Sequence, residues 1–227
     1  MATDSVVPEG AEQEIKTTET DLDALREQLQ DWLGERVGAT EAPRVYNVTR
    51  PTHSGMSSIS VLFDLDWSRS GQQTERLVVR LAPEETAFPV FPGYDLQRQF
   101  DVMAAVRDHG AVPVPAVRWV ESSSGPLGRP FLVMERAEGD VPVDNPPYVF
   151  GGWLYETNDD ERAALEKASV RVLAAIHAVD DPASRIPSLA GTNGLSGLRR
   201  HFENERAYYE WTRREDGLRI PVLERAF

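Results

Sequence analysis

The chain has 227 residues, with 24 Lys or Arg against 37 Asp or Glu, a formal net charge of −13 and no cysteine. The absence of cysteine excludes disulfides, thiolate metal sites and a cysteine nucleophile. The acidic balance argues against a nucleic-acid partner, because such proteins meet phosphates with clustered basic residues. No apolar run is long enough to cross a membrane and the first residues do not resemble a secretory signal, so we expect a cytoplasmic protein without a membrane partner.

The first part of the chain reads as an acidic leader followed by a helix. Residues 1–23 hold seven acidic residues and one lysine, and the stretch up to Thr18 has no apolar periodicity, so we expect residues 1–19 to be disordered. Thr20 and Asp23 have the spacing of a capping box, which predicts that a helix begins at Thr20 and continues to about Gly38. Apolar residues recur at helical spacing over this stretch: Leu22, Leu25, Leu29, Trp32 and Leu33.

A run of β-type patterns follows. Val45–Thr49 is a short strand candidate. Over Ile59–Trp67 every second residue is apolar, and the residues between them are Ser60, Leu62, Asp64 and Asp66, which predicts a half-buried strand. A polar turn at Ser68–Gln73 separates it from a second alternating run, Leu77–Leu81. Two such runs joined by a short polar turn predict an antiparallel hairpin.

One helix interrupts the predicted strands. Asp95 is placed to cap a helix that carries apolar residues on one side and ends near Gly110. The prolines of Val112–Pro115 require extended chain, which leads into a fourth strand through Val117 and Trp119. Phe131–Glu135 is the fifth strand candidate.

Beyond Gly139 the pattern becomes helical. A long helix is predicted to begin near Asp159 and to stop at Pro182, Ser196 is placed to cap another, and Pro221 suits the first turn of a last one. We therefore divide the chain into the leader, a mixed lobe over residues 20–138 and the first part of a helical lobe over residues 139–227.

The order of these elements and of several short motifs resembles the aminoglycoside phosphotransferase and choline-kinase-like family over residues 40–227. The motifs are Gly55-Met56-Ser57-Ser58, Arg80, Val112–Pro115, Pro130–Gly139 and Leu173–Asp180. The resemblance implies an α+β, protein-kinase-like fold: a five-stranded antiparallel sheet with one inserted helix, then a hinge and a helical lobe. It also implies transfer of the γ-phosphate of ATP or GTP, bound with Mg²⁺, to a hydroxyl of a small molecule.

Residues of the mixed lobe are candidates for holding the phosphates. Gly55, Met56, Ser57 and Ser58 can place backbone N–H groups and hydroxyls near them, although an ordinary hairpin turn explains the same residues. Arg80 interrupts an apolar strand, on the face opposite Leu77, Val79 and Leu81, and is either solvated or paired with an anion. The resemblance places the phosphate-holding base at this position.

The resemblance also supplies candidates for a brace and for a base-binding hinge. In kinases a glutamate on the next helix braces the base, and here the matching residue is Gln99, whose amide oxygen can accept a hydrogen bond from Arg80. The main-chain N–H and C=O groups from Glu135 to Ala137 would form hydrogen bonds with the edge of the adenine, with Met134 at the back of the pocket. The plainer alternatives are helix surface for Gln99 and a strand end followed by a loop for the hinge. His177, near a helix end, is interpreted as structural.

The residues for the chemical step are not found in this chain. The family carries an H-G-D-x-x-x-x-N loop, and the string Gly139–Asn145 matches only part of it, with Glu138 in place of the histidine and directly after the hinge. We assign no catalytic or metal-binding residue and expect the chain alone to lack kinase activity. Two readings stay open: a phosphotransferase truncated before its catalytic loop, and a non-catalytic nucleotide- or ligand-binding protein built on the same lobe.

Overall fold

A computed structural model describes residues 20–37, 43–51, 58–67, 74–84, 87, 90–110, 112–142, 147–191, 194–213 and 217–227. The acidic leader, Gly38, Gly55–Ser57 and the turn at Ser68–Gln73 lie outside the described residues. Within the described ranges, no helix has the length and apolar character needed to span a membrane.

Helix α1 (Leu22–Val37) forms where the apolar periodicity predicts it, but its cap differs from the prediction. The Oδ1 atom of Asp21 accepts hydrogen bonds from the backbone N–H groups of Asp23 (3.0 Å) and Ala24 (3.1 Å). A short carboxylate at this position reaches the first unpaired N–H groups of the helix and favours its positive end. Asp21, and not a box of Thr20 with Asp23, therefore caps the helix.

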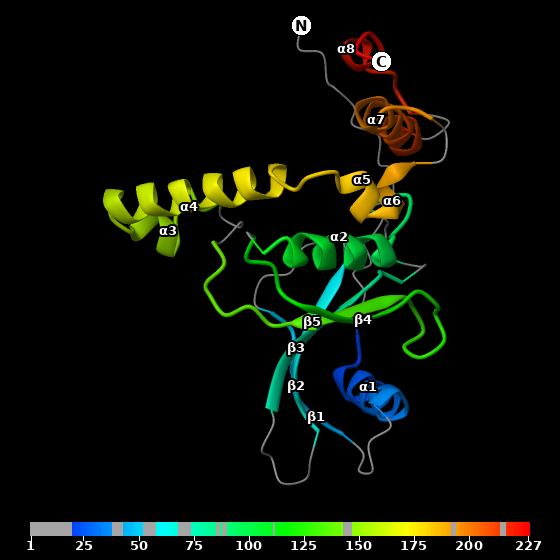
Figure 1. The fold of residues 1–227 in the computed structure, drawn as a ribbon, viewed down its shortest axis with the longest axis vertical. Coiled ribbons are helices and arrows are strands. Elements are labelled where there is room, and N and C mark those ends of the chain that lie inside the picture. Colours follow the sequence, from blue (N-terminus) through cyan, green and yellow to red (C-terminus); the bar gives the residue numbers. More distant parts are fainter. Residues whose placement is uncertain are drawn as a thin grey trace, which may run out of the picture.

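The sheet has five strands, and all of its pairs are antiparallel, as predicted. The strands are β1 (Arg44–Thr49), β2 (Ile59–Asp66), β3 (Thr74–Leu81), β4 (Val117–Glu121) and β5 (Phe131–Glu135). Their order is β1-β2-β3-β5-β4 (Figure 1). The last strand in sequence thus lies between β3 and β4, so residues from three separate parts of the chain meet at the middle of the sheet.

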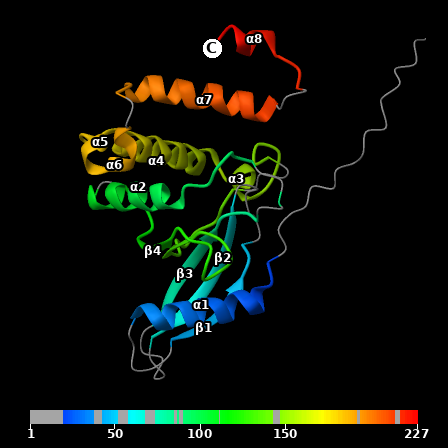
Figure 2. The same cartoon turned by 90° about the vertical axis from the view of Figure 1, so that its right-hand side faces the viewer.

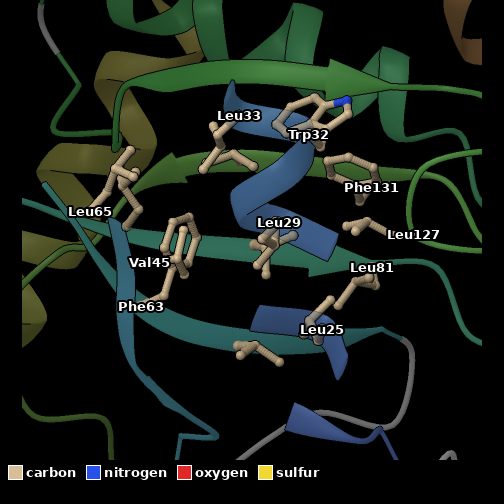
Figure 3. Close-up of a cluster of buried hydrophobic side chains, with 14 residues drawn as sticks. Leu25, Leu29, Trp32, Leu33, Val45, Phe63, Leu65, Leu81, Leu127 and Phe131 are labelled. Atoms are coloured by element: carbon tan, nitrogen blue, oxygen red, sulfur yellow. The ribbon is translucent and has the colours of Figure 1, made fainter. Parts of the chain in front are cut away.

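The main core lies between α1 and one face of the sheet, which we call the α1 face. Figure 3 shows leucines and a tryptophan of α1 directed at inward-facing residues of the strands. Trp32 packs on Phe131 edge to face, with 4.7 Å between the ring centroids. Alternation along each strand sends every second side chain to this core: Val61, Phe63, Leu65, Leu77, Val79, Leu81, Phe131 and Val133.

The inserted helix α2 (Leu96–Asp108) lies on the opposite face, which we call the α2 face. Its cap is the predicted Asp95, whose side chain accepts a hydrogen bond from the backbone N–H of Arg98 at 2.9 Å. The helix packs on β4 and β5 and buries Leu96 against Leu132 and Ala82. Helix α2 therefore covers β4 and β5, the part of this face farthest from the edge strand β1.

Helices follow the sheet. They are α3 (Trp153–Glu156), α4 (Asp159–His177), α5 (Pro182–Arg185), α6 (Pro187–Ala190), α7 (Gly197–Arg213) and α8 (Pro221–Glu224). Of these, α4, α7 and α8 are predicted by the sequence, whereas α3, α5 and α6 are not. In Figures 1 and 2, α2 lies between the sheet and α4 to α6, with α7 and α8 farther away. Ser196 caps α7, as predicted, by accepting a hydrogen bond from the N–H of Arg199 at 3.2 Å.

The end of α4 differs from the prediction. The helix stops at His177, and Pro182 instead begins α5. The residue before it, Asp181, has a left-handed backbone with φ 43°. A proline disfavours the helical conformation of the preceding residue, so the chain turns before Pro182 and the proline takes a first-turn position, where its missing N–H costs nothing.

Candidate functional site

Strand register places an apolar row beside a cation on the α2 face. Leu62 of β2 pairs with Val78 of β3, which pairs with Met134 of β5. Two residues farther along β3, Arg80 pairs with Ser60 on one side and with Leu132 on the other. Facing residues of an antiparallel pair project to the same side of a sheet. The apolar row (Leu62, Val78, Met134) and the Arg80 side chain therefore lie on the same face of the sheet.

Arg80 is half-buried and is tethered to the chain just before β2. Its Nε atom donates a hydrogen bond to the Oγ atom of Ser58 at 2.7 Å. Ser58 directly follows Gly55–Ser57, which lie outside the described residues. Within the described residues the other N–H groups of the guanidinium have no hydrogen-bond partner, and their planar fork suits a phosphate. The structure thus brings together two of the predicted phosphate-binding residues.

Gln99 lies on α2 and is half-buried, but in the described residues its side chain makes no hydrogen bond to Arg80. The guanidinium has Ser58 as a partner instead. The backbone N–H of Gln99 bonds to the carbonyl oxygen of Asp95 at 3.2 Å, an ordinary helix bond. Its role as a brace stays a prediction.

The predicted hinge offers one unused N–H group. The N–H of Glu135 donates to the carbonyl of Ala116 (2.8 Å) and that of Arg136 donates to the carbonyl of Arg76 (2.9 Å). The N–H of Ala137 has no partner among the described residues. A backbone donor at the end of the apolar row is the kind of group that orients a planar ligand.

A buried carboxylate with two polar partners, which no sequence motif predicted, lies at the hinge end of the same face. Asp64 of β2 is 9% exposed and contacts Asn47 of β1 and Arg136 of the hinge. In the sequence it occupies an ordinary polar position of an alternating strand, so nothing in the pattern marks it.

Other candidate features lie elsewhere. A hollow of about 1020 Å³ is lined by nine residues of α3, α4 and the segment before α3, among them Tyr148, Tyr155 and Leu165. Neither Arg80 nor the hinge lines it. Asp140 is exposed, whereas Asp144 and Asn145 lie outside the described residues, and His177 is exposed in the last turn of α4. Over the described ranges, no cluster of three or more His, Asp or Glu residues is placed to hold a metal ion.

The sheet order, the inserted helix and the hinge define the amino-terminal lobe of a kinase-like fold. A solved structure with this fold is that of a protein from Ralstonia eutropha assigned as an aminoglycoside phosphotransferase. It superposes with a TM-score of 0.52 at 24% sequence identity, and the match covers 87% of this chain and 50% of that one.

The family model described as the phosphotransferase enzyme family matches residues 61–227. This chain belongs to that family.

Two curated proteins are similar to parts of this chain. One is the probable acyl-CoA dehydrogenase IBR3 of Arabidopsis thaliana, which is 27% identical over 138 residues, covering 61% of this chain and 15% of that protein. The other is the acyl-CoA dehydrogenase family member 10 of Mus musculus, which is 33% identical over 113 residues, covering 50% of this chain and 10% of that protein. The chain therefore spans only a small share of the length of each of these relatives.

Proposed function

We propose that the chain binds ATP or GTP with Mg²⁺ as the nucleotide-binding part of a phosphotransferase that acts on a hydroxyl of a small molecule. The base would lie on the apolar row, with its edge at the N–H of Ala137 and its phosphates at Arg80. The observation that carries this proposal is the half-buried Arg80, held by Ser58 beside the row of Leu62, Val78 and Met134. A cation that is partly withdrawn from water is stabilised by an anionic ligand, and a polyphosphate is such a ligand.

In the proposed reaction an acceptor hydroxyl oxygen attacks the γ-phosphorus, the bond to the bridging oxygen breaks, and the nucleoside diphosphate leaves. The contribution of this chain is to bind and orient. Arg80 offsets the negative charge of the phosphates, Ser58 fixes the direction of the guanidinium, and Ala137 orients the base. We further propose that the groups accepting the hydroxyl proton and holding the metal belong to polypeptide outside these 227 residues. The match of this chain to only 50% of the solved relative supports that division.

The neutral Gln99 favours a second candidate function. A kinase lobe whose brace has lost its carboxylate is compatible with a binding protein that uses the fold without catalysis. Joining the chain to a segment that contains the family's catalytic loop would distinguish the two. Phosphoryl transfer by the joined protein supports an enzyme, whereas nucleotide binding without transfer supports a binding protein.

A binding titration tests the nucleotide proposal. We expect Mg·ATP to bind the chain, and Arg80→Ala to weaken the binding by about tenfold or more, since hydrogen bonds to charged groups contribute roughly 1.5–3 kcal/mol. The matched control is Arg44→Ala, which removes an exposed arginine from the edge strand β1. Equal losses in both variants would show that binding follows only the overall charge, and the proposal would fail.

A further inference from the structure

A carboxylate is buried at the hinge end of the α2 face. Asp64 is 9% exposed and is the buried charged residue of the described part of the chain. Its Oδ2 atom accepts a hydrogen bond from Nδ2 of Asn47 at 2.8 Å, and its Oδ1 atom lies 3.5 Å from Nη2 of Arg136. The side chain thus connects an edge strand of the sheet to the hinge.

The surroundings of Asp64 have an unusual backbone angle and buried polar atoms without hydrogen bonds. Asn47 has a left-handed backbone with φ 51°, at the irregularity of β1 between Tyr46 and Thr49. Both Oδ1 of Asp64 and Nε of Arg136 are buried and make no hydrogen bond in the described residues, although each lies within 3.5 Å of an oppositely charged atom. Buried ion pairs contribute little to stability compared with apolar packing, and buried polar atoms that make no hydrogen bond are uncommon. Such departures gather where a protein positions a functional group.

Arg136 is held from several directions. Its N–H donates to the carbonyl of Arg76 at 2.9 Å, its Nη2 faces Asp64, and its Nε lies 3.4 Å from Oε1 of Glu138. The next residue is Ala137, whose N–H is free within the described ranges. These contacts hold the backbone N–H and the side chain of Arg136, the residue from which the peptide carrying the N–H of Ala137 extends.

The position of Asp64 along β2 also matters. Asp64 lies two residues from Leu62, so both side chains project to the α2 face, and the register pairs Asp64 with Arg76 beyond Val78. The Asp64–Arg136 contact therefore lies at the hinge end of the apolar row, whereas Arg80 lies on its other side.

We propose that Asp64 is a positioning residue for the base-binding end of the site. Through Arg136 it fixes the hinge so that the N–H of Ala137 is directed at the edge of a planar base lying on the apolar row. This inference rests on the proposed nucleotide function and deepens it. It makes Asp64 important for ligands that carry a base and unimportant for a polyphosphate alone, which would contact Arg80.

Three ligands separate these roles on the full 227-residue chain: Mg·ATP, adenosine and tripolyphosphate. For Asp64→Asn we expect the dissociation constants of Mg·ATP and adenosine to rise about tenfold and that of tripolyphosphate to stay unchanged. The matched control is Asp66→Asn on the same strand, where Oδ1 accepts hydrogen bonds from the hydroxyls of Tyr46 (3.1 Å) and Thr74 (2.5 Å). This control is expected to leave all three constants unchanged.

The outcomes distinguish the inference from the function on which it rests. If the wild-type chain binds neither Mg·ATP nor adenosine, the nucleotide proposal fails and this inference fails with it. If the wild type binds and Asp64→Asn binds equally well, or loses tripolyphosphate binding to the same extent, only the positioning role is overturned.

A second variant covers the case in which Asp64→Asn does not fold. Replacing both partners, Asp64→Leu with Arg136→Met, removes the ion pair without leaving an unpaired buried charge. The double variant is expected to unfold at a temperature close to that of the wild type and to lose about tenfold in adenosine binding. Unchanged adenosine binding in this folded variant would overturn the proposal.

Discussion

At the residue scale, single side chains link segments that are far apart in the sequence. Glu121 at the end of β4 accepts hydrogen bonds from the backbone N–H (3.1 Å) and the hydroxyl (2.8 Å) of Ser123 and from Nη2 of Arg36 on α1 (2.6 Å). These hydrogen bonds, with those of Ser123 first, hold the pKa of the Glu121 carboxyl below its ordinary value of about 4.5.

A lowered pKa in the folded state makes stability depend on pH. The unfolded state binds the proton of Glu121 more tightly than the folded state does. The contribution of Glu121 to the free energy of unfolding is therefore present above the ordinary pKa and is lost as the pH falls through the pKa of the folded state. We expect Glu121→Gln to reduce the loss of melting temperature on acidification, and Ser123→Ala to do so in part. Melting curves from neutral to acidic pH measure this. An unchanged acid dependence in Glu121→Gln would contradict it.

Burial also predicts which aromatic residues stabilise the fold. Phe131 is fully buried and packs on Trp32, whereas Phe150 is 74% exposed. We expect Phe131→Ala to lower the free energy of unfolding by about 3–5 kcal/mol and Phe150→Ala to change it by less than about 0.5 kcal/mol. Urea unfolding of both variants provides the comparison. Similar losses would mean that the core does not lie between α1 and the sheet.

At the element scale, α1 covers the α1 face and begins at a specific cap. The side chain of Asp21 accepts hydrogen bonds from two backbone N–H groups at the start of the helix. The hydroxyl of Thr20 instead accepts a long hydrogen bond of 3.4 Å from Arg129. Loss of the Asp21 side chain would leave these donors to water and remove a negative charge from the positive end of the helix.

The two candidate caps of α1 can be told apart by mutation. Asp21→Ala is expected to lower the free energy of unfolding by about 1 kcal/mol. Thr20→Ala is expected to lower it by less, because its hydroxyl does not bind the helix N–H groups. The free energy of unfolding in urea is the measurement. A larger loss for Thr20→Ala would restore the capping box that the sequence suggested.

At the scale of the whole molecule, the helical part has little core of its own. None of the 19 residues of α4 is buried, and four of its large apolar side chains are 39–59% exposed. They are Leu165, Val170, Leu173 and Ile176. A helix with so much apolar surface is typical of the interior of a larger assembly, which agrees with the proposal that further polypeptide completes the lobe.

The exposed surface of α4 should make the isolated chain associate. We expect sedimentation to show self-association that rises with concentration, and the double change Leu173→Lys with Ile176→Lys to reduce it without altering the stability of the sheet. Lys167→Glu on the same helix is the control. It changes a charge and leaves the apolar side chains in place, so we expect it not to reduce the association. A strictly monomeric wild-type chain would contradict this expectation.

Much of the fold follows from the sequence alone. Alternation along Ile59–Trp67 and Leu77–Leu81 determines two strands and sends Arg80 to the face opposite the core, because successive side chains of a strand point to opposite sides. Asp95 and Ser196 identify two helix starts, since capping depends on residues only three positions apart. These features are local, so a local pattern is sufficient to predict them.

The candidate site depends on tertiary structure. The pairing of Arg80 with Ser58, 22 residues earlier, and the contact of Asp64 with Arg136 exist only because β2, β3 and β5 lie side by side in register. The N–H of Ala137, which has no partner among the described residues, leaves no trace in the pattern of side chains. The sequence by itself determined the strands, the caps and the face on which Arg80 lies. Which polar groups meet on that face was decided by strand pairing, because register between distant segments is set by the packing of the whole sheet.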